Sequence, residues 1–133
     1  MGRILVVEDE PEVRRLLLAM VKWCGHDVCA AGPCLKPEVP HECNLSCCDT
    51  QCAPDLAVIA VIAPRHCSGV EAAMKAVAKW PSVKVLLISA SPVSAWPASE
   101  QVRLLSLPTN CYSFLPKPFT VVDLKGAVQH LIG

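Results

Sequence analysis

Short apolar runs alternate along the chain with segments whose apolar residues recur at helical spacing. Uninterrupted apolar runs of this length are typical of strands that are buried on both faces of a sheet. The segments that we interpret as strands are Ile4–Val7, Asp27–Ala30, Leu56–Ile62, Val83–Ser89 and Tyr112–Leu115.

Apolar residues at intervals of three and four predict helices between these strands. The first helix is expected to begin near Pro11, where a first turn tolerates proline, and to stop at Gly25. Its apolar positions are Val13, Leu16, Leu17, Met20, Val21 and Cys24. The other predicted helices are Glu42–Gln51, Val70–Val77, Ala98–Leu105 and Val121–Leu131.

Alternation of strands and helices favours an α/β fold, a doubly wound five-stranded parallel sheet covered on both faces. We expect one domain over residues 1–133, with an irregular proline- and cysteine-rich segment at about 32–52. Within it, Gly32–Pro40 contains three prolines and is interpreted as a loop. Sites in such folds lie at the carboxyl ends of the strands.

Composition supports this interpretation and excludes several functions. The chain has 133 residues, of which 53% are hydrophobic and 18% are charged, which suits one globular core. Twelve basic residues balance twelve acidic ones, which argues against nucleic-acid binding. No apolar run approaches the roughly 20 residues of a membrane helix, and acidic residues at 8–10 interrupt the N-terminal apolar stretch. We therefore expect no membrane association and a cytoplasmic location.

Polar side chains follow three of the predicted strands. Glu8 and Asp9 follow the first, Ser89 ends the fourth, and Lys117 with Pro118 follows the fifth. Two carboxylates, a hydroxyl and an ammonium group at one edge would suit a divalent cation beside a phosphoryl group. Taken singly, each has a simpler interpretation, as a solvated acidic turn, a capping serine or a surface lysine.

The motifs ILVVEDEPEVRRLL, PDLAVIAVIAP, SGVE, VKVLLISAS and FLPKPF, in this order and spacing, resemble the receiver domains of two-component response regulators. The resemblance covers nearly the whole chain and implies a flavodoxin-like fold. It matches Glu8 and Asp9 to the metal-binding acidic pair, Ser89 to the switch hydroxyl and Lys117 to the family's lysine. The bond from that lysine to Pro118 is often cis in the family.

Two further positions matter in this comparison. Phe114 falls where the family places its aromatic switch residue. The phospho-accepting aspartate, by contrast, is replaced. Counting from Pro64 or from Asp55 puts Ala60 at its place, and a loop one residue longer would put Val61 there. Asp55 cannot substitute, because it lies at the other end of the strand, roughly 16 Å away.

Neither replacement can form an aspartyl phosphate, because that reaction needs a carboxylate nucleophile. The same loss removes a metal ligand, so Glu8 and Asp9 should bind Mg²⁺ weakly, with no other cofactor expected. Lys117 can still pair with Asp9. The change is either natural or introduced; Cys67 and the Gly32–Pro40 loop also depart from the family and favour a natural origin.

The resemblance therefore implies a receiver-like signalling domain of a two-component phosphorelay that is not an enzyme and acts by binding. The expected partner is a histidine kinase or a downstream signalling protein, with the domain itself a monomer or weak dimer. Phosphorylation of Glu8 or Asp9 instead would consume a ligand of the metal that the reaction needs.

Nine cysteines suggest an alternative, a thiol- or metal-responsive sensor built on a receiver scaffold. An odd count without an export signal argues against a disulfide framework. On a helix, Cys43 with Cys47 and Cys48 with Cys52 form two pairs spaced by four residues, which could bind zinc. Zinc sites usually contain closer CxxC pairs, and this segment has none. Thiols that line the core explain the same residues more simply.

Overall fold

The computed structural model describes residues 2–8, 11–31, 54–61 and 69–132. The strands in these residues are β1 (Arg3–Val7), β2 (Asp27–Ala31), β3 (Leu56–Ala60), β4 (Lys84–Ser89) and β5 (Tyr112–Pro116). The helices are α1 (Pro11–Trp23), α2 (Gly69–Lys79), α3 (Ala98–Leu104) and α4 (Val121–Ile132), with a short 3₁₀ helix, η4 (Val93–Ala95).

The strands form one parallel sheet in the order β2-β1-β3-β4-β5. This is the flavodoxin-like order, in which the chain first adds strands on one side of β1 and then on the other. The predicted doubly wound five-stranded sheet is therefore confirmed. Its switch point lies between β1 and β3, which places the expected site at their carboxyl ends.

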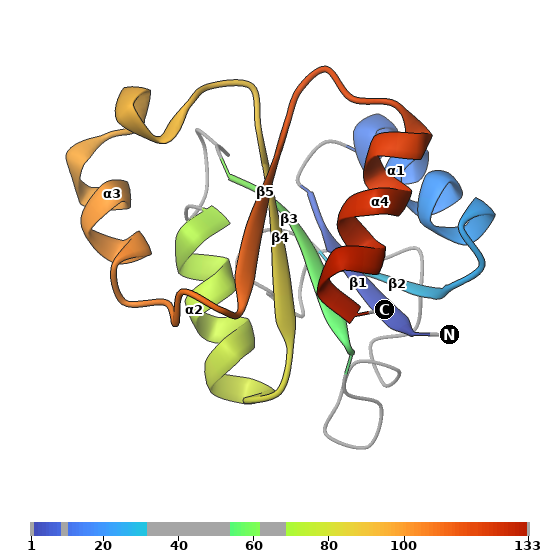
Figure 1. The fold of residues 1–133 in the computed structure, drawn as a ribbon, viewed down its shortest axis with the longest axis horizontal. Helices are drawn as coiled ribbons and strands as arrows, with labels where there is room; N and C mark the ends of the chain where they lie inside the picture. The colour runs from blue at the N-terminus through green and yellow to red at the C-terminus, as the bar shows by residue number, and fades with distance from the viewer. Residues whose placement is uncertain (1, 9–10, 32–53, 62–68, 133) are drawn as a thin grey trace.

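Helices cover both faces of the sheet, with α1 and α4 on one side and α2 and α3 on the other (Figure 1). Alternate strand residues enter two separate cores because successive side chains point to opposite faces. Ile4 and Val6 pack under α1 and α4, together with Leu17, Val21, Leu124 and Val128. Leu5 and Val7 pack on the opposite face, together with α2, Leu104 of α3 and Trp96.

The predicted elements agree with the observed ones to within about two residues wherever the structure describes them. The third strand ends at Ala60 rather than at Ile62, which lies outside the described residues. The predicted helix Glu42–Gln51 and the whole 32–52 segment also lie outside them. None of the described helices is both long and apolar enough to cross a membrane.

One apolar position of the predicted first helix does not face the core. Leu16 is 61% exposed, whereas its neighbour Leu17 is 3% exposed and packs against the sheet. Successive helical residues point roughly 100° apart, and the side of α1 that packs on the sheet carries Leu17 and the partly buried Leu18, so Leu16 lies outside it. The buried face of α1 instead includes Arg14, which is 5% exposed.

Candidate functional site

The carboxyl ends of β1 and β3 bring Glu8 and Ala60 to the same edge of the sheet. Val7 and Ile59 are register partners, and Glu8 follows the first as Ala60 follows the second. Glu8 is 6% exposed and Ala60 is half-buried. A carboxylate on one strand thus has a methyl group at the corresponding place on the next.

The next two strands continue this edge. Ala60 pairs with Ile88, so Ser89 lies one step beyond it on β4. Ser89 in turn pairs with Pro116, and Lys117 follows. The Lys117 backbone N–H donates to the Ser89 carbonyl at 3.0 Å. The structure therefore places Glu8, Ala60, Ser89 and Lys117 along one edge; Asp9 lies outside the described residues.

Ala60 and Val61 differ in their surroundings. The backbone N–H of Val61 donates to the Ile88 carbonyl at 2.9 Å, and its side chain, 1% exposed, belongs to the core beneath α2. Ala60, by contrast, is only half-buried at the carboxyl edge of the sheet. Asp55 lies at the amino end of β3, where its carboxylate accepts a hydrogen bond from the Arg3 backbone at 2.9 Å. The expectation that Asp55 stands at the opposite end is confirmed.

Arg14 on α1 secures the turn after β1. Its Nη1 donates to the backbone carbonyl of Glu8 at 2.8 Å, and both residues are buried. A hydrogen bond from a charged donor satisfies this buried carbonyl and places a guanidinium cation beside the acidic residue. The position of Glu8 thus depends on a residue from the first helix.

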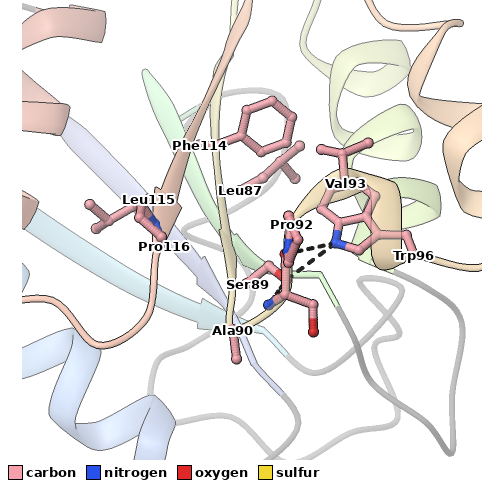
Figure 2. Close-up of a pocket in the computed structure, with 10 residues that line it drawn as sticks. Leu87, Ser89, Ala90, Pro92, Val93, Trp96, Phe114, Leu115 and Pro116 are labelled. Atoms are coloured by element: carbon pink, nitrogen blue, oxygen red, sulfur yellow. Dashed lines mark hydrogen bonds between the residues drawn. The ribbon is translucent and has the colours of Figure 1, made fainter.

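The Ser89 hydroxyl lies within a small hydrogen-bond network (Figure 2). It donates to the Ser91 carbonyl at 2.9 Å and accepts from the Ser91 backbone N–H at 3.1 Å. The indole Nε1–H of Trp96 donates to the Ser89 hydroxyl at 3.3 Å and to the Ser91 carbonyl at 3.1 Å. This network holds the β4–α3 loop, residues 90–97, against the end of β4.

Phe114 lies on β5 opposite Leu87. Its ring packs edge-on against Trp96, with centroids 5.8 Å apart, and against Tyr112, with centroids 5.5 Å apart. The ring is 39% exposed. Through its contact with Trp96, Phe114 thus packs β5 against the β4–α3 loop. Its role as a switch stays a prediction.

Lys117 is exposed, and its bond to Pro118 is cis, as the resemblance implied. The expected ion pair between Lys117 and Asp9 lies outside the described residues. So do the candidate thiol ligands Cys43, Cys47, Cys48 and Cys52.

The described part of the edge gives a poor fit to Mg²⁺. The side chain of Ala60 supplies no oxygen, and the Ser89 hydroxyl is already engaged. The Arg14 guanidinium occupies the Glu8 carbonyl and adds a competing positive charge. Within the described ranges, no group of three or more His, Cys, Asp or Glu side chains is arranged to hold a metal.

Two free thiols are described outside the candidate site. Cys24 begins the turn after α1, and Cys111 is buried before β5. Burial raises the pKa of both thiols, with Lys125 opposing the rise at Cys24 and Lys84 opposing it at Cys111. Both are thus held in the protonated, less reactive form.

Sequence reasoning missed the two residues that organise the edge. Arg14 stands three residues before Leu17 and seven before Val21, which places it on the buried side of the predicted helix. A charged residue at such a position could have been singled out from the sequence. Trp96 lies between two prolines in a non-periodic loop, and no local pattern relates it to Ser89.

Solved structures share this fold. The chemotaxis protein CheY4 of Vibrio cholerae is 16% identical, with a TM-score of 0.74, over 98% of each chain. A response regulator receiver protein from Sinorhizobium medicae is 23% identical, with a TM-score of 0.72, over 98% of this chain and 93% of that one. A chain from the complex of histidine kinase ThkA with response regulator protein TrrA is 26% identical, with a TM-score of 0.65, over 100% of both.

The chain therefore has the fold of CheY-like response regulator receiver domains over its full length. No protein-family model matches the sequence, and no curated protein matches it either.

Proposed function

We propose that this chain is a receiver-like domain of two-component signalling that cannot form an aspartyl phosphate and acts through protein–protein contacts. The observation that carries the proposal is the alanine at the carboxyl end of β3, next to Glu8 and Ser89. Ala60 lies between the strands that present Glu8 and Ser89, in the fold of receiver domains. The burial of Val61 supports Ala60, rather than Val61, as the phosphoacceptor position.

The chemistry of the edge supports a domain that is not an enzyme. Phosphoryl transfer to a receiver needs a carboxylate oxygen that attacks phosphorus while the bond from phosphorus to the donor's leaving group breaks. A methyl group has no lone pair for this attack. Without a carboxylate at this position the edge also lacks a hard oxygen ligand. It therefore provides neither the nucleophile nor a well-held cation.

The partner we propose is a histidine kinase or a downstream signalling protein. The response regulator TrrA, in the structure compared above, is in complex with the histidine kinase ThkA. We further propose a cytoplasmic, monomeric or weakly dimeric domain that does not bind nucleic acid, consistent with its balanced charge.

Restoration of the carboxylate tests the proposal. The parent protein, the Ala60→Asp variant and an Ala90→Asp control are incubated with a small phosphodonor and Mg²⁺, and their intact masses are measured. Ala90 is exposed directly after Ser89, so its variant adds a carboxylate near the edge but not on β3. We expect only Ala60→Asp to gain a phosphoryl group.

Two outcomes would contradict the proposal. A phosphorylated parent would show that another residue accepts the group. An unmodified Ala60→Asp variant that remains folded would show that the edge is not a receiver site silenced at one position. Binding is then measured against purified histidine kinases; we expect the parent's affinity to be the same with and without phosphodonor.

A further inference from the structure

A pocket of about 370 Å³ opens beside the candidate site, between the carboxyl ends of β4 and β5 and the β4–α3 loop (Figure 2). Its lining residues carry no charge: Leu87, Ser89, Ala90, Ser91, Pro92, Val93, Trp96, Phe114, Leu115 and Pro116. A cavity of roughly 150 Å³ is enough to bind benzene in another protein. The volume is therefore sufficient for a ligand with one or two rings.

The main polar groups of this pocket are already satisfied. The Ser89 hydroxyl, the Ser91 carbonyl and the Trp96 indole N–H bond to one another at 2.9 to 3.3 Å. A charged ligand would lose its hydration here without gaining an oppositely charged partner. The pocket thus favours an uncharged ligand.

The aromatic wall favours a ring. Phe114 and Trp96 meet edge-on at 5.8 Å, and 39% of Phe114 remains exposed. A third ring could add another edge-to-face or offset-stacked contact and remove this apolar surface from water.

The dimensions favour a small molecule over a peptide. The lining comes from short pieces of chain, namely Leu87 with residues 89–93, Trp96, and residues 114–116. A docked helix needs a groove that accepts apolar side chains over two turns or more. We propose that this pocket binds a small, uncharged aromatic molecule, a function beyond receiver signalling.

Toluene is the probe, and the signals of the indole N–H groups are the readout. Three tryptophans give three indole signals in a ¹⁵N-labelled sample, and Trp96→Phe assigns the signal of Trp96. We expect toluene to shift the Trp96 signal saturably and to leave those of Trp23 and Trp80 in place. Benzoate and benzylamine carry the same ring with a charge, and they should bind at least tenfold more weakly.

Matched variants locate the site. Phe114→Ala removes one aromatic wall and should weaken toluene binding at least fivefold. Val122→Ala, at a position that is 68% exposed and outside the lining, should leave it within twofold. If Phe114→Ala does not fold, the comparison of toluene with benzoate and benzylamine on the unmodified protein still tests the proposal.

Three outcomes would overturn the proposal. They are no saturation up to the solubility of toluene, equal shifts of all three indole signals, and equal binding of benzoate and toluene. Unchanged affinity in a folded Phe114→Ala variant would also reject this pocket as the site.

Discussion

The indole N–H of Trp96 donates a hydrogen bond to the hydroxyl of Ser89 over 3.3 Å, which attaches the β4–α3 loop to the end of β4. Trp96 is 3% exposed and Ser89 is 9% exposed, so water cannot readily replace either partner. The hydroxyl that the resemblance identifies as a switch is thus held by a residue from the following loop.

A double-mutant cycle measures this attachment. Trp96→Phe keeps a ring but removes the donor, and Ser89→Ala removes the acceptor. We expect each change to lower the free energy of unfolding by about 1 to 3 kcal/mol, with a coupling of about 1 kcal/mol. Urea unfolding gives these values. Trp23→Phe, at a position that is 66% exposed, should change stability by no more than about 0.5 kcal/mol. Strict additivity would mean that the hydrogen bond contributes nothing.

Arg14 and Arg15 provide a second matched pair. Arg14→Met removes the donor to the buried Glu8 carbonyl while it retains an unbranched apolar chain. An unsatisfied buried carbonyl should lower the free energy of unfolding by about 2 kcal/mol. Arg15 is exposed, and Arg15→Met should have an effect below about 0.5 kcal/mol in the same denaturation experiment. Equal effects of the two substitutions would contradict a structural role for the Arg14 bond.

Gly126 is a site for stabilisation. It lies in the middle of α4, is exposed, and an added Cβ would meet nothing within 4 Å. Gly126→Ala should therefore raise the free energy of unfolding by about 0.5 to 1 kcal/mol, because alanine loses less backbone entropy in a helix. At Gly2, by contrast, a Cβ would approach Ile132 Cδ1 to 2.7 Å. Gly2→Ala should give no such gain in thermal unfolding.

The thiol of Cys111 should make stability depend on alkaline pH. Burial raises its pKa above the ordinary value of 9.0. Above that pH the unfolded chain releases this proton while the folded chain keeps it, so the free energy of unfolding falls as the pH rises toward the folded pKa. Cys111→Ala removes this contribution. Its unfolding free energy should fall less steeply between about pH 8 and pH 10 than that of the parent.

Thr109→Ala, an exposed substitution that removes no titrating group, is the control for Cys111 and should keep the slope of the parent. If Cys111→Ala also keeps that slope, the thiol ionises equally in both states and the expected burial effect is absent.

The inner strands β1, β3 and β4 were predictable because they are buried on both faces. Their apolar runs are continuous, so Ile4, Val58 and Leu86 could be assigned to a core without knowledge of strand order. The edge residues Glu8, Ser89 and Lys117 were also predictable, because all strands are parallel and their carboxyl ends share one side.

The path of the β4–α3 loop and the orientation of α1 were less accessible to sequence reasoning. The bond from Trp96 to Ser89 depends on how a proline-containing loop folds back on β4. The exposure of Leu16 depends on the angle at which α1 lies on the sheet, which a list of apolar positions does not specify. The local spacing of apolar residues specifies neither the path of this loop nor the angle of this helix.

The interior position of β1, between β2 and β3, affects how the chain can fold during synthesis. Residues 1–31 emerge from the ribosome before β3 and contain β1, α1 and β2, so β1 can pair with β2 on one side only. The other side of β1 must wait for β3, whose neighbouring residue Asp55 bonds to Arg3 across 52 positions. Until then, one row of β1 backbone groups lacks its final partners, and its apolar side chains lack half of their cover. Nascent chains halted before β3 should therefore be the form most prone to bind chaperones.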